Sequence, residues 1–344
     1  MAKESKLDLD TIMKNINKKS GADIIHFGLS KETYQRIPFT SPRMNYCTYG
    51  GLPKGRIIEF SGEEHGGKTT SALDNLANYQ QIDERPAVYL DAENTLDPVW
   101  AEKLGVDLDK LIIIQPEFES AEELLQTMLD LISSGEVGYG VIDSVAALIP
   151  MKELEGDIED AQYAGNAMAI TKFIKKAELL CKKTDFTLIM INQVRDDLKS
   201  MYPGATRTPG GRALKHFCSV RMEFRRGAFL NEKGEEIKKS SESPAGNIVI
   251  MSMDKNKTCP PNRRGGFYSL DYANGINYLR DLVDVALKYD MIQQAGAWFT
   301  IVDPDTGECK TEKIQGMANV YEFLKDEAHE DVLTFIEDYI DAQI

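Results

Sequence analysis

A glycine-rich segment, residues 62–69, matches the phosphate-binding pattern G-x-x-x-x-G-K-[ST] at every fixed position. Small residues at this spacing let backbone N–H groups curl around phosphate oxygens. A helix beginning at Lys68 would direct the positive end of its dipole toward the same anion. We expect Lys68 to reach the β- and γ-phosphates of a nucleotide and the Thr69 hydroxyl to ligate Mg²⁺. The residues predicted to hold the nucleotide are Gly62, Glu63, Glu64, His65, Gly66, Gly67, Lys68, Thr69 and Thr70.

A second acidic position follows the apolar stretch Tyr139–Ile142, which ends in Asp143. This is the form of the second nucleotide-binding motif, in which the aspartate holds the Mg²⁺ shell from a neighbouring strand end. Taken alone, such a residue is equally consistent with a helix cap. Its position 74 residues after Thr69, with strands and helices between, favours the metal-binding interpretation.

Two more polar side chains follow predicted strands. Glu93 comes shortly after the strand Val88–Leu90 and is the candidate to activate water for attack on the γ-phosphate, whereas Asp91 is interpreted as structural. Gln193 follows the strand Thr187–Ile191 and could hydrogen-bond a γ-phosphate oxygen, signalling its presence to the next loop. The alternatives are a helix cap for the acidic pair and a surface amide for Gln193.

Apolar runs alternate with segments of helical periodicity along the middle of the chain, which predicts an α/β fold with a mostly parallel central sheet and helices on both faces. Ligands bind such sheets at the carboxyl ends of the strands, where the residues above fall. A polar stretch over 231–246 is expected to form an exposed hairpin tip. Strands are predicted over residues 57–60, 87–90, 111–114, 139–142, 187–191, 219–224 and 248–253, with helices from 68, over 120–133 and over 166–182.

Three parts are expected along the chain. Residues 1–36 form an N-terminal oligomerisation arm, with a helix over 7–19 and a strand over 24–27. Packing of this arm on a neighbouring subunit and packing on its own domain are equally favoured alternatives. Residues 37–277 form the nucleotide-binding core. Residues 278–344 form a small C-terminal α+β domain, with helices over 279–290, 317–328 and 330–342 around a hairpin at 305–307.

Length and composition restrict the class of protein. The 344 residues suffice for one large domain with appendages or for two domains. Five widely spaced cysteines without a C-x-x-C pair argue against a disulfide framework or a zinc site and suit a reducing cytosol. No apolar run approaches the roughly 18 residues of a membrane helix, and no apolar signal core follows Met1. A cytoplasmic protein without a membrane partner is expected.

The charge distribution is uneven. A net charge of −15 argues against non-specific attraction to nucleic acid, although binding depends on where basic residues cluster. Residues 193–226 contain eight basic and three acidic residues, a local excess of five positive charges in an acidic protein. This segment is either a nucleic-acid contact or an ordinary solvated surface.

The chain resembles the RecA-type homologous recombinases, bacterial or phage-encoded, over nearly its whole length. The phosphate loop alone indicates only a nucleoside triphosphatase, whereas the ordered series of blocks is highly specific for this family. The blocks that carry the resemblance are Gly50–Arg56, the phosphate loop, Asp91–Glu93, Leu96–Pro98, Lys103–Asp107, Asp143–Leu148, Ile191–Arg195, Gly210–Gly211, Lys255–Lys257 and Ala295–Trp298.

This resemblance implies a RecA-like P-loop ATPase core. It implies an ATP-dependent recombination protein that forms a helical filament on single-stranded DNA, pairs it with homologous double-stranded DNA, exchanges strands and hydrolyses ATP when stimulated by DNA. ATP and Mg²⁺ are the implied cofactors, and DNA repair and the SOS response to DNA damage are the implied processes. Loader or mediator proteins, co-protease activity on repressors, and bacterial, phage or plasmid origin stay open.

The family's active-site roles carry over to matching positions. Glu93 matches the catalytic glutamate and Gln193 the γ-phosphate sensor. Lys255 and Lys257 match lysines that reach ATP bound on the adjacent subunit, so a filament would complete the active site. The positions matching those around the adenine ring are Asp97, Trp100 and Tyr272, with Trp100 in place of a more usual tyrosine.

Two DNA-binding loops are implied, over residues 155–165 and 194–210. Tyr163 stands where the first loop has an apolar wedge, and its ring could stack on a base, which contributes about 1–3 kcal/mol. Leu198 is placed to insert between base triplets. The implied phosphate contacts and close backbone approaches are Lys175, Arg195, Arg207, Gly210, Gly211 and Arg212.

Several positions depart from the family pattern. The acidic pair Asp196–Asp197 should weaken or redirect DNA contacts. His216 stands where the family often has an aromatic residue involved in subunit communication, and Met168 where an arginine would contact DNA. His65 and Gly66 replace small hydroxyl residues, and His65 is expected to be exposed to solvent rather than catalytic.

Two other classes of protein remain as alternatives. A hexameric ring motor such as a helicase shares the phosphate loop and the sheet, but would not predict the spacing of the loop over 194–210. A non-catalytic ATP-gated scaffold is the other. Closed rings in electron microscopy would indicate the first, and absence of DNA-stimulated ATP turnover the second.

Overall fold

A computed structural model describes residues 8–21, 25, 34–157, 165–196, 206–207, 211–238 and 243–344. The chain divides into two compact units, Met1–Gln35 and Arg36–Ile344. In the first unit, helix α1 (Leu9–Ser20) corresponds to the helix predicted over 7–19 and ends at Gly21 in the left-handed conformation. Of the strand predicted over 24–27, only Ile25 is described, and its backbone exchanges two hydrogen bonds of 2.9 Å with the Asn17 side chain.

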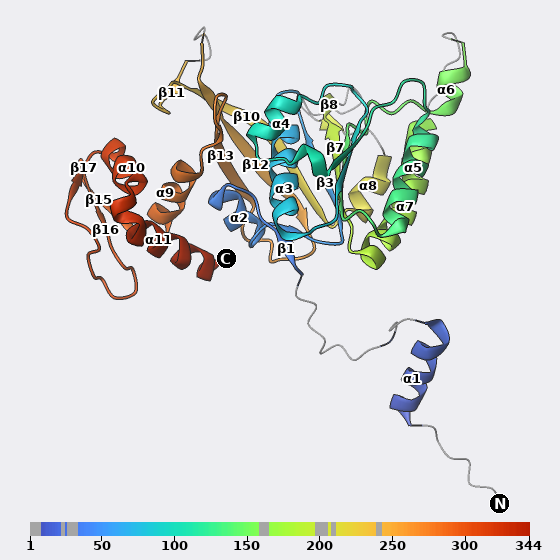
Figure 1. Ribbon diagram of the computed structural model, residues 1–344, viewed down its shortest axis with the longest axis horizontal. Helices are drawn as coiled ribbons and strands as arrows, with labels where there is room; N and C mark the ends of the chain where they lie inside the picture. Colours follow the sequence, from blue (N-terminus) through green and yellow to red (C-terminus); the bar gives the residue numbers. More distant parts are fainter. Residues whose placement is uncertain are drawn as a thin grey trace, which may run out of the picture. The chain divides into compact units, whose positions relative to one another are not determined.

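A ten-stranded sheet forms the centre of the second unit (Figure 1). The strand order is β14-β13-β12-β10-β3-β7-β6-β4-β5, with β11 paired to β10. The strands are β3 (Ile57–Gly62), β4 (Ala87–Asp91), β5 (Leu111–Ile114), β6 (Tyr139–Asp143), β7 (Thr187–Gln193), β10 (Val220–Leu230), β11 (Glu236–Ile237), β12 (Gly246–Asn256), β13 (Gly265–Asp271) and β14 (Gly275–Ile276).

The pairing confirms a mostly parallel sheet. The six strands from β10 through β3, β7, β6 and β4 to β5 are parallel, whereas β12, β13 and β14 extend the sheet antiparallel. Parallel neighbours need crossover connections, which helices supply, while antiparallel neighbours can follow each other through short loops. The stretch over 231–246 contains β11, which pairs back on β10, and residues 239–242 lie outside the described part.

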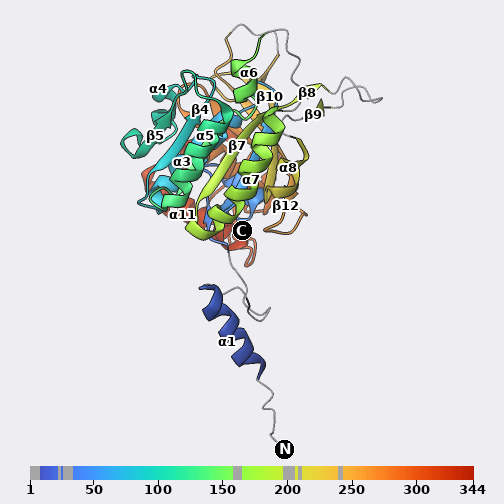
Figure 2. The same ribbon diagram turned by 90° about the vertical axis from the view of Figure 1, so that its right-hand side faces the viewer.

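Helices cover both faces of the sheet, as predicted. Successive residues of β3 show why: Ile58 and Phe60 pack against α3 on one face, whereas Ile57 packs with α5 and α7 on the other. Figure 2 shows α5 and α7 side by side over that second face. The helices are α2 (Pro42–Thr48), α3 (Lys68–Ile82), α4 (Pro98–Lys103), α5 (Ala121–Ser134), α6 (Met151–Glu155), α7 (Gly165–Thr184) and α8 (Gly211–Phe217).

The C-terminal segment has a hydrophobic cluster of its own and confirms the expected α+β composition. A three-stranded antiparallel sheet packs with three helices. The sequence patterns predicted the three helices but only a short hairpin in place of the sheet. The three-part division at 36/37 and 277/278 stays a prediction. The elements are α9 (Tyr278–Lys288), β15 (Ile292–Ala295), β16 (Trp298–Ile301), β17 (Ile314–Gln315), α10 (Met317–Lys325) and α11 (Glu330–Gln343).

The remaining elements are short. They are β1 (Arg36–Ile37), β2 (Leu52–Pro53), β8 (Arg195–Asp196), β9 (Thr206–Arg207) and the 3₁₀ turns η1 (Leu108–Lys110) and η2 (Glu327–His329). Within the described ranges, no helix is both long enough and apolar enough to span a membrane.

Candidate active site

The phosphate loop lies between the end of β3 at Gly62 and the start of α3 at Lys68. Gly62 has φ 148°, and a Cβ built on it would lie 2.0 Å from the backbone oxygen of Phe224. Gly67 caps α3 with φ 94°, and its Cβ would lie 2.8 Å from Val249. Both positions therefore require glycine, because β10 and β12 lie directly against the loop.

Lys68 is folded back over the loop. Its Nζ donates hydrogen bonds to the carbonyl oxygens of Gly62, at 3.0 Å, and Glu63, at 2.6 Å, and the residue is only 7% exposed. Burial lowers the pKa of Lys68, and the carboxylates of Asp143 and Glu93 act against this shift. The ammonium group can exchange these carbonyl oxygens for phosphate oxygens without leaving the site.

The Thr69 hydroxyl and Asp143 meet at the end of β6. Thr69 Oγ1 donates to Asp143 Oδ2 at 2.7 Å, and the Tyr89 hydroxyl donates to the same oxygen at 2.7 Å. Burial raises the pKa of Asp143, although its two hydrogen bonds lower it. A hydroxyl and a carboxylate are hard oxygen donors of the kind that Mg²⁺ takes beside phosphates. The residues present therefore fit that ion.

Glu93 and Gln193 are brought together from different strand ends. Gln193 Nε2 donates to Glu93 Oε1 at 3.1 Å, and the Ser144 hydroxyl donates to the same oxygen. Asp91 accepts hydrogen bonds from the backbone N–H groups of Thr95 and Leu96, both at 3.0 Å. Asp91 thus fixes the turn that carries Glu93, in agreement with its structural interpretation.

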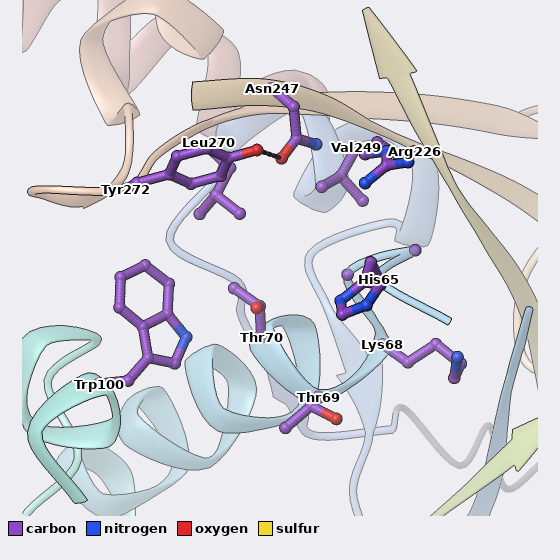
Figure 3. A pocket seen from close by; sticks show the side chains of 12 residues that line it. His65, Lys68, Thr69, Thr70, Trp100, Arg226, Asn247, Val249, Leu270 and Tyr272 are labelled. Atoms are coloured by element: carbon purple, nitrogen blue, oxygen red, sulfur yellow. Dashed lines mark hydrogen bonds between the residues drawn. The ribbon is translucent and has the colours of Figure 1, made fainter. Parts of the chain in front are cut away.

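A cavity of 530 Å³ opens beside the loop, and Figure 3 shows the side chains around it. Lys68 lies on one side, and the rings of Trp100 and Tyr272 lie on the other. Asp97 does not line the cavity; it caps α4, the helix that carries Trp100, by accepting hydrogen bonds from the backbone N–H groups of Val99 and Trp100. The lining residues are His65, Gly66, Gly67, Lys68, Thr69, Thr70, Trp100, Arg226, Asn247, Val249, Leu270 and Tyr272.

Four of these residues were absent from the nucleotide-site prediction: Arg226, Asn247, Val249 and Leu270. They lie on β10, β12 and β13, and reach the loop because β10 pairs with β3 while β12 and β13 follow across the sheet. The Tyr272 hydroxyl donates to Asn247 Oδ1 at 2.9 Å. No local motif marks these positions, so only strand pairing could have identified them.

Lys255 and Lys257 lie far from their own chain's phosphate loop. Strand register places Lys255 opposite Arg221, which pairs in turn with Glu59. The Lys257 N–H donates to the carbonyl oxygen of Ser219, and the Ser219 N–H donates to that of Ile57. Lys255 is thus level with Glu59 and Lys257 with Ile57, so three and five residues of strand, roughly 10 and 16 Å, separate these levels from Gly62. Lys255 Nζ donates to the carbonyl oxygens of Lys215 and His216, and Lys257 Nζ to that of His216, at the end of α8.

The predicted DNA-contacting residues are described only in part. Tyr163, Leu198 and Gly210 lie outside the described residues. For Arg195, Arg207, Gly211 and Arg212 the backbone alone is described: Arg195 pairs with Arg207 in the hairpin of β8 and β9, and Gly211 and Arg212 begin α8. Lys175 is exposed on α7, as is Met168.

The fold and the site define a P-loop nucleoside triphosphatase built on a mostly parallel sheet. Residues 7–277 match the family described as the RecA N-terminal domain. Protein RecA of Bacillus licheniformis is 36% identical over 335 residues, covering 96% of this chain and 90% of the relative. Protein RecA of Lactobacillus acidophilus is 37% identical over 344 residues, with 99% and 89% covered. Protein RecA of Aquifex aeolicus is 37% identical over 310 residues, with 89% and 86% covered.

The chain belongs to the RecA family of recombinases. It is accordingly a protein of DNA recombination and repair with strand-exchange function, and it binds ATP and DNA as this family does in general.

Proposed function

We propose that this protein forms a helical filament on single-stranded DNA when ATP is bound, pairs the strand with homologous double-stranded DNA, and hydrolyses ATP at a rate stimulated by DNA. The single observation that supports this most directly is the hydrogen bond between Gln193 and Glu93. Gln193 is the last residue of β7 and lies two positions before Arg195, the first basic residue of the segment 193–226. A change at the γ-phosphate therefore has a short route to the loop that grips DNA.

Residues of this chain perform the hydrolytic step. Glu93 accepts a proton from a water molecule as the water oxygen bonds to the γ-phosphorus and the bond to the bridging oxygen of ADP breaks. Lys68 balances the charge on the phosphate oxygens, and the Ser144 hydroxyl holds the Glu93 carboxylate in place. Thr69 and Asp143 hold Mg²⁺, which supplies charge stabilisation at the phosphates.

The γ-phosphate controls the grip on DNA. Gln193 leaves Glu93 and donates a hydrogen bond to the phosphate, and this movement orders the loop over 194–210.

The DNA phosphates are then contacted by Arg195, Arg207, Arg212 and Lys175, while Leu198 spaces the bases. Tyr163 stacks on a base and the Gly210–Gly211 backbone approaches the phosphate closely. Hydrolysis removes the sensed group and loosens the loop.

A neighbouring subunit completes the site. Lys255 and Lys257 lie at the opposite end of the sheet from their own phosphate loop, so a second subunit stacked on that end would present its nucleotide to them. Their positive charges would then read the γ-phosphate from across the interface.

The test is to measure ATP turnover with and without single-stranded DNA, and to image the protein with DNA and a non-hydrolysable ATP analogue. We expect DNA-stimulated turnover and open helical filaments that disassemble with ADP. Closed rings would instead indicate a hexameric motor. DNA binding that is equal with ATP, ADP or no nucleotide would refute the proposal.

The cellular setting is part of the same proposal. Free cysteines suit a reducing compartment, which supports a cytoplasmic location. A role in the SOS response and interaction with loader or mediator proteins follow from the proposed filament, because other proteins would have to recognise it or help it assemble.

A further inference from the structure

Strand β12 contains a β-bulge beside the two lysines. Its pairing with β10 joins Met253 to Met222 and Lys255 to Arg221, so Asp254 has no residue opposite it. An extra residue of this kind bends a strand and changes the face to which the following side chains point.

The bulge decides where Lys255 and Lys257 point. Val249, Met251 and Met253 form a buried row on the α3 face of the sheet. Strict alternation would continue this row with Lys255 and Lys257, and would bury two ammonium groups in an apolar core. Because the strand has one extra residue at Asp254, Lys255 instead shares the face of Arg221, and its Nζ reaches the end of α8.

The Arg221 side chain connects the bulge to the buried Glu59 carboxylate and so stabilises the bulge. Arg221 Nε donates to Glu59 Oε2, and the other branch of its guanidinium lies 3.6 Å from Asp254 Oδ2. The side chain of Glu59 is completely buried and that of Arg221 is 13% exposed, whereas that of Asp254 is 35% exposed. The planar fork of arginine contacts the two carboxylates through different nitrogens at fixed spacing, and a single ammonium group does not reproduce this geometry.

The same carboxylate also contacts the strand that carries the predicted phosphate sensor. Asn192 Nδ2 donates to Glu59 Oε1 at 3.0 Å, and Asn192 directly precedes Gln193. Glu59 therefore links the β7 end, which faces the chain's own nucleotide, to the bulge beside Lys255. A mostly buried ion pair is weak evidence for stability alone, because desolvation opposes the attraction of its charges. Its position suggests a role in orientation.

We propose that Glu59, Arg221 and Asp254 form a clamp that aims Lys255 and Lys257 at the nucleotide of the neighbouring subunit. This inference rests on the proposed cross-subunit role of the two lysines. Glu59, Arg221 and Asp254 are positioning residues, since they act through the lysines and contact no substrate. The clamp keeps the lysines out of the core and fixes the strand end that carries them.

The most selective test is Asp254→Ala, with Asp254→Glu as the conservative variant, because Asp254 is the most exposed member of the clamp. Arg221→Lys keeps the charge but loses the planar fork of the guanidinium.

ATP turnover is measured against ATP concentration with saturating single-stranded DNA, and ATP binding is measured without DNA. Asp254→Ala and Arg221→Lys should lower kcat about tenfold, because a misplacement of about 1 Å in a catalytic group can cost on the order of a hundredfold. ATP binding without DNA should stay within about twofold of the wild type, because neither Asp254 nor Arg221 lines the cavity beside the phosphate loop. Asp254→Glu should restore most of the turnover.

A matched control separates orientation from stability. Asp83 is another mostly buried carboxylate, with Lys54 at 2.9 Å and Arg85 at 2.8 Å, and it follows the end of α3. Asp83→Asn should lower the thermal midpoint at least as much as Arg221→Lys and leave kcat unchanged. If Asp83→Asn lowers kcat to the same extent as Arg221→Lys at equal loss of stability, or if Asp254→Ala and Arg221→Lys keep full kcat, the clamp is refuted.

Lysine variants distinguish failure of the clamp from failure of the proposed function. Lys255→Ala and Lys257→Ala are assayed in the same way. If they abolish DNA-stimulated turnover while Asp254→Ala and Arg221→Lys do not lower it, the clamp is wrong and the cross-subunit site stands. If the lysine variants turn over ATP at the wild-type rate, the cross-subunit site itself is wrong, whatever the clamp variants do.

Discussion

The carboxamide of Gln193 lies 3.1 Å from the Glu93 carboxylate, to which its Nε2 donates a hydrogen bond. The two residues are 100 positions apart in sequence: Gln193 is the last residue of β7, and Glu93 follows the end of β4 by two residues. They meet because β6 lies between β4 and β7 in the sheet, and because all three strands run parallel. The predicted water-activating group and the predicted phosphate sensor are therefore direct neighbours.

Replacing the Glu93 carboxylate tests its role as a base. Glu93→Gln should retain ATP binding and lower ATP turnover by on the order of 10²–10⁴-fold, because an amide does not accept the proton of the attacking water. Nucleotide binding and single-turnover hydrolysis are measured side by side. Ser144→Ala removes only the hydroxyl that orients Glu93 and should have a smaller effect. Wild-type turnover in Glu93→Gln would remove this residue from the mechanism.

The hydroxyl of Thr69 tests the expected Mg²⁺ site. Thr69→Val keeps the shape of the side chain but loses the oxygen that bonds Asp143 at 2.7 Å. We expect ATP affinity in the presence of Mg²⁺ to fall at least about tenfold, and affinity measured with EDTA to change little. Titration of a fluorescent ATP analogue under both conditions measures this difference. Thr69→Ser retains the hydroxyl and should behave like the wild type; equal losses with and without Mg²⁺ in Thr69→Val would contradict the metal assignment.

Aromatic residues at one end of the cavity test base binding. Trp100→Ala should weaken ATP binding by about 1–3 kcal/mol, the usual contribution of an aromatic ring stacked on a base. Trp100→Tyr should retain most of the affinity, because a flat ring remains. Isothermal titration with ATP and with inorganic triphosphate distinguishes base contact from phosphate contact. A loss for both ligands would indicate damage to the phosphate loop instead.

Buried Asp281 should make stability depend on pH. Burial raises its pKa to about 7, although hydrogen bonds from Ser41 and the Ser269 N–H act against this. The unfolded carboxyl loses its proton near pH 4, so the folded state binds more protons between about pH 4 and 7. The resulting stability is complete below about pH 4 and is lost as the pH rises through 7.

Asp281→Asn should therefore reduce the slope of unfolding free energy against pH in this window, and at pH 8 should be more stable than the wild type by roughly 1–3 kcal/mol. Urea unfolding at half-unit steps from pH 5 to pH 8 measures both quantities. Some slope should remain, because burial also raises the pKa of Asp74 to about 7. An unchanged slope would show that Asp281 is ionised in the folded protein across the whole window.

Gly62→Ala tests the close approach of β10 to the phosphate loop. The new methyl group would lie 2.0 Å from the backbone oxygen of Phe224, so the two strands must separate. We expect destabilisation by more than about 4 kcal/mol or failure to fold. Gly135→Ala is a matched control: φ is 76°, and nothing lies within 4 Å of the added carbon. That variant should cost only about 1 kcal/mol of conformational strain, as measured by thermal unfolding.

Much of the parallel core could be predicted because its signals are local. The phosphate loop specifies its own turn. Helix α5 begins at Ala121 after the N-cap Ser120, which forms a capping box with Glu123, close to the predicted start at 120. The antiparallel strands are harder to predict from sequence. β13, β14 and the strands β15 and β16 have short or mixed patterns, and their stability comes from pairing with neighbours rather than from propensity.

The sequence by itself determined the family, the parallel α/β core, the phosphate loop and the chemical types of Glu93, Asp143 and Gln193, because each depends on residues close together in the chain. Only the tertiary structure decided the direction of Lys255. Local alternation would have directed this lysine into the core with Met253, and the bulge at Asp254 reverses that direction. The bulge exists only when β12 pairs with β10, beside the buried Glu59–Arg221 ion pair. The strand pairing joins residues more than thirty positions apart, and the ion pair joins residues more than one hundred and sixty positions apart.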